Sequence, residues 1–186
     1  MSKQCTKNTI RSIVSDKCVK SNQYMGELMK TIRKSLSPQI KYIKNLSSDI
    51  KRSLIWYTNG YNFQDFNINL RFDNPLTAEQ TYHLNNITKA FSNVPPLNNP
   101  IMVYRYTSVK NAIKTDKAFT SVSMSSRVAL KISREPQNEK RKCCILNILV
   151  PSGIKVLPLF AISDLKWELE VRSEERRVGK ECLRLC

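Results

Sequence analysis

The sequence has few of the residues and runs that identify several classes of protein. It has one histidine, His83, and its six cysteines form no Cys-x-x-Cys pair, so a Cys/His zinc site of the usual spacing is not supported. No stretch approaches the roughly 18 apolar residues that a membrane span needs. The N-terminus is polar and basic, without the apolar segment of a secretory signal. We therefore expect no metal and no membrane span, and an intracellular location where cysteines stay reduced.

Acidic residues are also scarce. The chain has 15 Asp and Glu against 31 Lys and Arg, a formal net charge of +16. Such a charge favours anionic partners such as nucleic acid, a membrane surface, an acidic protein or a phosphate-rich cofactor. It fits equally well a solvated basic surface with no specific partner. The charge alone does not decide between these alternatives.

Two features bound the part of the chain that folds as a domain. A length of 186 residues with 41% hydrophobic residues suits one domain with a basic helical arm, which we expect over residues 1–45. Residues 172–182, RSEERRVGKEC, resemble the translation of a widely used sequencing adapter. We therefore expect residues 172–186 to be a non-native tail, and we leave them out of the fold prediction. The folded domain would then span residues 46–171.

The first half of the chain has helical periodicity. Apolar residues at helical spacing predict a helix over residues 25–36, which Pro38 ends. Ser48 or Asp49 can cap a second helix, and Gly60 suits its end. Thr77 and Gln80 form a capping-box pattern before a third helix that contains His83. The proline-rich run at residues 93–100 predicts a loop.

The second half has the pattern of strands. Residues 101–107, 118–124 and 143–150 predict strands, and we expect further strands at 154–161 and 167–171. A short helix is expected at 125–132. Cys143 and Cys144 should point to opposite faces of their strand, one of them into the core. Helices followed by strands indicate an α+β domain.

Two pairs of polar residues lie at strand spacing. Ser121 and Ser123 are two apart, and so are Glu168 and Glu170. On a strand, residues i and i+2 share a face and lie about 6.6 Å apart along the chain. Glu168 and Glu170 would then face one side while their apolar neighbours Trp167, Leu169 and Val171 pack inward. The same spacing also fits ordinary amphipathic strands whose serines and glutamates face water.

Three segments, in this order, together resemble one enzyme family. They are Val103-Tyr104-Arg105-Tyr106-Thr107-Ser108, Phe119-Thr120-Ser121-Val122-Ser123-Met124-Ser125 and Glu168-Leu169-Glu170. They are similar to the arginine strand, the F-x-S-T-S-x-S strand and the E-x-E of the arginine-serine-glutamate class of mono-ADP-ribosyltransferases. That class includes binary toxins and related viral enzymes. Upstream, the segment 57–61 running into Ile68-Asn69-Leu70-Arg71 looks like the helical region of the family.

The resemblance implies a fold, a reaction and a set of site residues. The fold would be N-terminal helices packed on two small mixed β-sheets, with NAD in the cleft between the layers. Arg105, assisted by Arg71, would bind the NAD pyrophosphate, and Ser121 and Ser123 would support the cofactor. Glu170 would stabilise the ribose cation left when nicotinamide departs, and Glu168 would orient the acceptor. A glutamate at the first position of E-x-E goes with arginine acceptors in the family, so the implied partner is a protein with an accessible arginine.

Two other functions fit parts of the sequence. A basic nucleic-acid-binding module would explain the net charge, but no recognised nucleic-acid-binding element is present. A degenerate relative could keep the fold and bind a partner without catalysis. We expect a monomer, and an enzyme that uses NAD as co-substrate and no metal.

Overall fold

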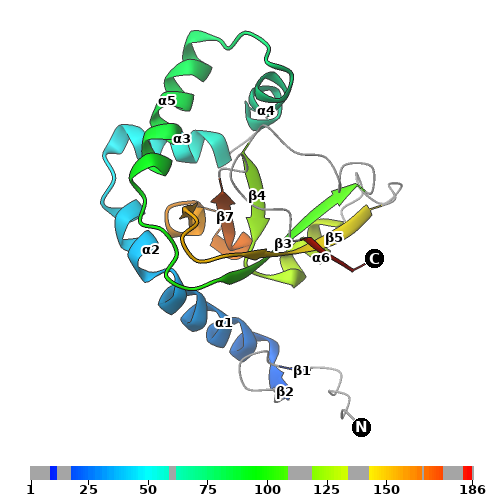
Figure 1. Ribbon diagram of the computed structural model, residues 1–186. Coiled ribbons are helices and arrows are strands. Elements are labelled where there is room, and N and C mark those ends of the chain that lie inside the picture. The colour runs from blue at the N-terminus through cyan, green and yellow to red at the C-terminus, as the bar shows by residue number, and fades with distance from the viewer. Residues whose placement is uncertain are drawn as a thin grey trace. The chain divides into compact units, whose positions relative to one another are not determined.

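The computed structural model describes residues 9–11, 18–58, 62–108, 119–133, 143–164, 166–173 and 182–185. The chain divides into two compact units, Met1–Ser37 and Pro38–Cys186. Figure 1 labels the elements of both units along the chain.

The described part of the first unit contains two paired strands and a helix. Strands β1 (Thr9–Arg11) and β2 (Cys18–Lys20) pair antiparallel, with Thr9 opposite Lys20. Helix α1 (Ser21–Ser35) follows directly and covers all but the last residue of the range 25–36 over which a helix was predicted. It ends before Pro38, as expected, and the Leu36 N–H donates to the Ile32 carbonyl at its last turn.

Four helices precede the sheet of the second unit. They are α2 (Ser37–Lys44), α3 (Ser48–Thr58), α4 (Asn62–Phe72) and α5 (Ala78–Asn93). Helix α5 begins with the predicted capping box, in which the Thr77 hydroxyl accepts from the Gln80 N–H and the Gln80 side chain accepts from the Thr77 N–H. Helix α2 was not predicted, because Pro38 indicated only the end of a helix. Proline is tolerated in the first turn of a helix, where its missing N–H has no partner to lose.

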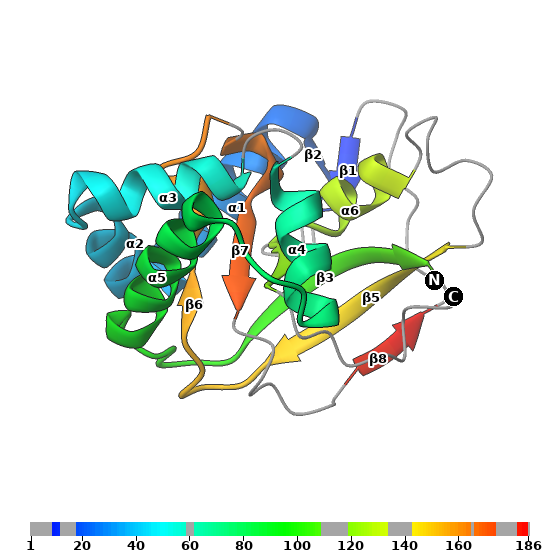
Figure 2. The same cartoon turned by 90° about the horizontal axis from the view of Figure 1, so that it is seen from above.

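The described strands of the second unit form a single sheet. Its order is β6-β7-β4-β3-β5-β8, and each pair of neighbours is antiparallel. The strands are β3 (Ile101–Ser108), β4 (Thr120–Ser123), β5 (Cys143–Val150), β6 (Val156–Leu157), β7 (Glu170–Ser173) and β8 (Cys182–Leu185). Figure 2 shows β3 and β5 running side by side, and α6 (Ser126–Ser133) follows β4.

The α+β class is confirmed, whereas the number of sheets differs from the expectation. Two small mixed sheets were expected, but β4 pairs with both β3 and β7 and so joins the strands into one antiparallel sheet. Part of the segment 172–186 lies in this sheet, because β7 continues through Ser173 and β8 pairs with β5.

Two predicted strands are shorter than expected. Residues 154–161 contain the two-residue strand β6 and then the 3₁₀ helix η2 (Leu159–Ala161). Residues 167–171 contain the end of the 3₁₀ helix η3 (Lys166–Glu168) and the start of β7. Of the two adjacent cysteines, Cys144 is buried as expected for the inward-facing one.

The core of the second unit lies where α3, α4 and α5 meet the sheet. Tyr57, Phe66 and Phe91 are at most 3% exposed, and each large apolar side chain buried in this way contributes about 1.5–3 kcal/mol. Phe119, just before β4, stacks on Phe91 with 5.5 Å between ring centroids and meets Tyr57 edge-on at 5.6 Å. The start of β4 is thereby fixed against the helices.

Candidate active site

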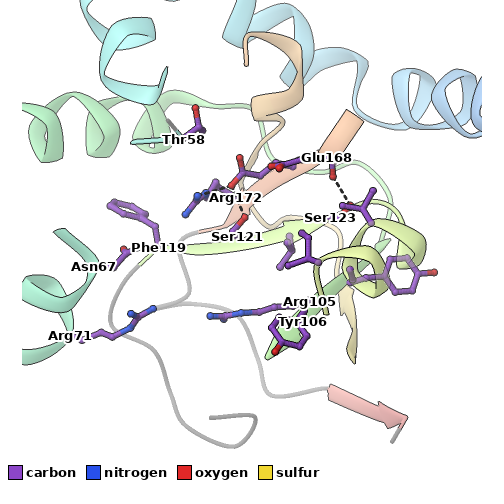
Figure 3. A pocket seen from close by; sticks show the side chains of 16 residues that line it. Thr58, Asn67, Arg71, Arg105, Tyr106, Phe119, Ser121, Ser123, Glu168 and Arg172 are labelled. Atoms are coloured by element: carbon purple, nitrogen blue, oxygen red, sulfur yellow. Dashed lines mark hydrogen bonds and ion pairs between the residues drawn. The ribbon is translucent and has the colours of Figure 1, made fainter. Parts of the chain in front are cut away.

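One cavity of about 510 Å³ lies in the second unit, between the helices and the sheet. It is lined by residues of α3, α4, β3, β4, α6, η3 and β7. All six residues that the sequence nominated line it, namely Arg71, Arg105, Ser121, Ser123, Glu168 and Glu170. Figure 3 shows several of these side chains around the cavity. Segments far apart in the sequence are thus brought to one place by the pairing of β4 with β3 and β7.

Glu170 is the most constrained acidic group of the cavity. It is the first residue of β7, lies opposite Ser123 in the register, and is 7% exposed. The Ser121 hydroxyl donates to Glu170 Oε1 at 2.5 Å, in the range of a charge-assisted hydrogen bond. The carboxylate is therefore held at one position in the cavity wall.

Arg172 forms an ion pair with Glu170 that the sequence did not predict. Its Nη2 lies 2.6 Å from Glu170 Oε1, and the two side chains are 7% and 9% exposed. The guanidinium also lies over the Tyr57 ring, 4.2 Å from its centroid, a cation–π geometry. Burial opposes the charge of Arg172, but Glu170 and Tyr57 hold its pKa above the ordinary value. Position 172 was missed because the segment from Arg172 onward was expected to be a non-native tail and was left out of the fold prediction.

Glu168 is placed differently from the sequence prediction. It ends the 3₁₀ helix η3, so Glu168 and Glu170 do not form an i, i+2 pair on one strand, and that expectation was wrong. The reason is Leu169, whose φ of 50° interrupts the extended backbone between the two glutamates. Both glutamates still line the cavity, and Leu169 and Val171 are buried as expected. The side chain of Trp167 lies outside the described residues.

The second serine of β4 contacts the backbone beside Glu168. The Ser123 hydroxyl donates to the Glu168 carbonyl at 2.7 Å and accepts from the Ser125 N–H at 3.1 Å. Its one hydroxyl hydrogen is thereby used within the protein. Ser121 therefore contacts the carboxylate of one glutamate, and Ser123 contacts the peptide of the other.

Two arginines reach the cavity from opposite sides. Arg71 lies in the last turn of α4 and Arg105 in the middle of β3, and both are partly buried. Figure 3 shows the two guanidinium groups extending toward each other. Two convergent guanidiniums suit a bound group that carries more than one negative charge.

Sequence reasoning missed the polar residues that support the helical side of the cavity. The Tyr57 hydroxyl donates to Asn67 Oδ1 at 2.8 Å and lies 3.3 Å from the Phe119 carbonyl oxygen. Burial raises the pKa of the Tyr57 phenol, so Tyr57 stays neutral. Asn67 lies one helical turn before Arg71, and both line the cavity. That i, i+4 spacing was the available signal for Asn67.

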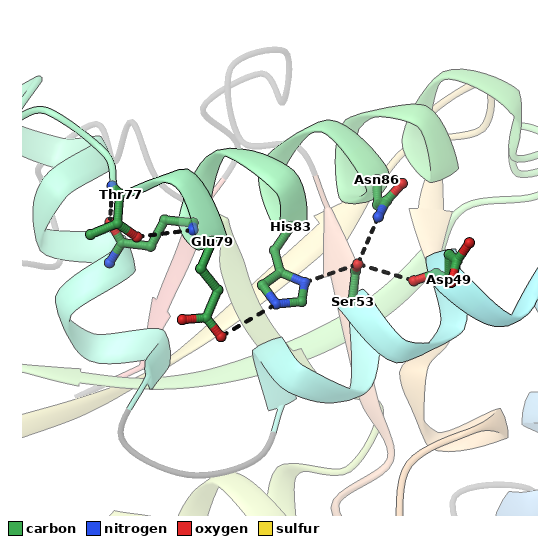
Figure 4. A network of polar contacts seen from close by, with 7 residues as sticks. Asp49, Ser53, Thr77, Glu79, His83 and Asn86 are labelled. Atoms are coloured by element: carbon green, nitrogen blue, oxygen red, sulfur yellow. Dashed lines mark hydrogen bonds and ion pairs between the residues drawn. The ribbon is translucent and has the colours of Figure 1, made fainter.

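The lone histidine belongs to a separate polar network between α3 and α5, shown in Figure 4. The Ser53 hydroxyl donates to the Asp49 carbonyl at 3.0 Å and lies 2.9 Å from His83 Nδ1. Because that hydroxyl has one hydrogen, His83 Nδ1–H and the Asn86 amide are donors to Ser53 Oγ. The His83 ring stacks on Trp56 with centroids 4.0 Å apart, and burial lowers the pKa of His83. His83 is thus a structural residue and does not line the cavity.

Neither a group of side chains arranged to hold a metal ion nor a membrane-spanning helix is found among the described residues. No group of three or more His, Cys, Asp or Glu side chains is arranged to hold a metal ion there. No helix in that part of the chain is both long enough and apolar enough to cross a membrane.

The fold is similar to solved ADP-ribosyltransferases, although the sequence is distant from them. Plx2a, an ADP-ribosyltransferase toxin from Paenibacillus larvae, aligns with a TM-score of 0.60 and 16% identity over 80% of this chain and 83% of that one. The C3 exoenzyme of Clostridium limosum aligns with a TM-score of 0.58 and 19% identity over 81% of this chain and 82% of that one. Exoenzyme S of Pseudomonas aeruginosa was solved with 14-3-3 protein and Carba-NAD. It aligns with a TM-score of 0.56 and 19% identity over 80% of this chain and 76% of that one.

No protein-family model matches the sequence, and no curated protein sequence is significantly similar to it. The structural alignments show that the chain has the fold of the ADP-ribosyltransferase toxins.

Proposed function

We propose that this chain is a mono-ADP-ribosyltransferase that takes ADP-ribose from NAD and transfers it to an arginine side chain of a protein. The observation that carries the proposal is the fixed Glu170 carboxylate, bonded to Ser121 in a cavity that also holds Arg71 and Arg105. Among the structures of similar fold, exoenzyme S was solved with Carba-NAD and BECa of Clostridium perfringens with NADH. The similar fold and the charged and polar side chains of the cavity support NAD as the cofactor of this chain.

NAD would bind through its negative charges. Arg71 and Arg105 would donate paired hydrogen bonds to the pyrophosphate, and Asn67 lies beside Arg71 to assist. A cavity of about 510 Å³ is within the size range of nucleotide and cofactor sites. No metal is needed, because the guanidiniums supply the positive charge.

Glu170 would act on the bond between nicotinamide and the ribose. When that bond breaks, nicotinamide leaves with the electron pair and positive charge develops on the ribose, as in glycoside cleavage. A fixed carboxylate beside the sugar stabilises this charge more in the transition state than in the ground state. The hydrogen bond from Ser121 holds the carboxylate in place for that step.

Glu168 would act on the acceptor. An arginine guanidinium is protonated and a poor nucleophile, so a carboxylate must bind it, orient one nitrogen toward the ribose carbon and accept a proton as the bond forms. Glu168 lines the same cavity and is more exposed than Glu170. A glutamate at this position is the reason for proposing arginine as the acceptor.

The proposal includes the organisation of the chain. Residues 1–45 would be a basic arm, 46–171 the catalytic domain, and 172–186 a non-native tail. The first residue of that tail, Arg172, is the one that pairs with Glu170 in this chain. The protein would act as a monomer inside a cell, as a toxin-like or viral effector. Resequencing the gene across codon 171 tests the tail directly, since a native tail would be recovered unchanged.

A second function has one specific observation in its favour. Because Arg172 already pairs with Glu170, the carboxylate has a cationic partner without any substrate. A protein with the fold that binds a partner without catalysis would show the same pair. NAD hydrolysis distinguishes this non-catalytic protein from an enzyme.

The proposal is tested with labelled NAD, a mixed cell lysate and purified protein. Wild type should label protein, Glu170→Ala should abolish both labelling and NAD hydrolysis, and Glu168→Ala should keep slow hydrolysis while losing labelling. The chain with its resequenced C-terminus should be assayed in parallel. A steep loss of nucleic-acid binding with rising salt, in a protein that neither hydrolyses NAD nor labels anything, would favour the basic binding module instead.

A further inference from the structure

The backbone between the two glutamates has an unusual conformation. Among the described residues, Asp73 (φ 55°) and Leu169 (φ 50°) are the two non-glycine residues with positive φ. Asp73 is exposed and lies in the turn after α4, and aspartate is a residue type that tolerates this region. Leu169 is 1% exposed, and leucine rarely adopts this conformation. Such outliers persist where the surrounding structure holds them, and they cluster at functional sites.

The contacts around Leu169 account for its conformation. Its N–H donates to the Lys166 carbonyl at 3.3 Å, and its carbonyl accepts from the Met124 N–H at 3.1 Å. One residue earlier, the Glu168 carbonyl accepts from the Ser123 hydroxyl at 2.7 Å. The peptides on both sides of Leu169 are therefore bonded to the end of β4, and its buried side chain holds the residue between them.

This conformation sets the relative positions of the two glutamates. An extended residue 169 would place Glu168 and Glu170 on one strand, two residues apart on the same face. Because φ of Leu169 is 50°, the two glutamates lie in different elements. Glu168 ends the 3₁₀ helix η3, with its carbonyl facing Ser123, and Glu170 begins β7 opposite Ser123 in the register. Glu170 is also held by contacts that do not involve residue 169, namely the β4–β7 pairing and the hydrogen bond from Ser121.

We propose that Leu169 is a positioning residue for Glu168. Its left-handed backbone, held by its buried side chain, sets the orientation of Glu168 in the cavity and thereby the efficiency of transfer to the acceptor relative to hydrolysis. The inference rests on the proposed function, since it assigns transfer to Glu168 and NAD cleavage to Glu170. It predicts that residue 169 controls the ratio of the two reactions.

The test compares three variants of Leu169. Leu169→Ile keeps the number of side-chain atoms but is branched at Cβ, which strongly disfavours positive φ. Leu169→Met is unbranched at Cβ and similar in volume, so it is the matched control. Leu169→Gly adopts positive φ at no steric cost but has no side chain to hold the peptide. Nicotinamide release measures hydrolysis, and label transfer from NAD to agmatine, a small guanidine, measures transfer.

The expected result is a change of ratio. Leu169→Met should keep the transfer-to-hydrolysis ratio of wild type, and Leu169→Ile and Leu169→Gly should lower it by about tenfold, with hydrolysis largely kept. If Leu169→Ile does not fold, Leu169→Gly decides the matter. Equal losses of both reactions, or an unchanged ratio in an active protein, would overturn the inference alone. A folded wild-type protein that does not transfer to agmatine would overturn the proposed acceptor, and this inference with it.

Discussion

The Glu170–Arg172 ion pair makes a quantitative prediction about stability and activity together. Both side chains are less than a tenth exposed, and the charged atoms are 2.6 Å apart. Replacing Glu170 by glutamine leaves the Arg172 charge buried without its counter-ion. Breaking one side of a buried pair costs about 3–5 kcal/mol, because the remaining charge is neither solvated nor compensated. For a chain of this size, about 3 kcal/mol lowers Tm by about 6–12 °C.

The same substitution removes the carboxylate proposed to stabilise the ribose cation. Loss of one such fixed electrostatic group lowers kcat by about 10²–10³-fold. Glu170→Gln should therefore lower both Tm and NAD hydrolysis, and the activity loss alone would not distinguish chemistry from partial unfolding. The double variant Glu170→Gln/Arg172→Met separates the two effects. It leaves no buried charge at positions 170 and 172, so most of the lost Tm should return, whereas hydrolysis should stay about 10²–10³-fold below wild type.

Circular dichroism melts and nicotinamide release on the same preparations measure both quantities. A Glu170→Gln variant whose Tm stays within about 2 °C of wild type would refute the buried ion pair. A double variant that regains hydrolysis along with stability would refute the role of Glu170 in catalysis, because the defect of the single variant would then be one of folding.

Three further predictions follow from individual contacts. Arg105→Lys should raise KM for NAD about tenfold with a smaller change in kcat, because lysine cannot donate two parallel hydrogen bonds. Initial-rate kinetics measure both constants, and an unchanged KM would contradict the prediction. Thr77→Ala should lower the free energy of unfolding by about 1 kcal/mol through loss of its hydrogen bond from Gln80, with hydrolysis unchanged, as urea titration can show. Because burial lowers the pKa of His83 below 6.5, the unfolded chain takes up a proton more readily, so stability should fall as pH drops through 6.5. Melts between pH 5 and 8 should show a shallower slope for His83→Gln, and an equal slope would refute the assignment.

The parts of the fold that local sequence determines were predicted well. The capping box of α5 depends on Thr77 and Gln80, three residues apart, and it is present. Strand β5 coincides with the predicted range 143–150, because its long apolar run is bounded by turn residues. The six nominated residues all line one cavity. Five of them were nominated from three short segments whose order along the chain matched the family.

The parts that depend on distant contacts were not predicted. Leu169 has a strand-like sequence context. The Ser123 hydroxyl donates to the Glu168 carbonyl and the Met124 N–H donates to the Leu169 carbonyl, and these two hydrogen bonds favour a left-handed conformation at Leu169. Periodicity contains no information on such contacts. Tyr57 and Asn67 support the cavity through a hydrogen bond between two helices, which no local pattern indicated.

Catalysis of NAD cleavage by Glu170 is tested most directly by nicotinamide release from wild type beside the stability-restored double variant Glu170→Gln/Arg172→Met. We predict steady hydrolysis by wild type and a rate about 10²–10³-fold lower for the double variant, measured at a temperature at which both proteins are folded. Equal rates from the two proteins, or a folded wild type that releases no nicotinamide, would contradict the proposed role of Glu170.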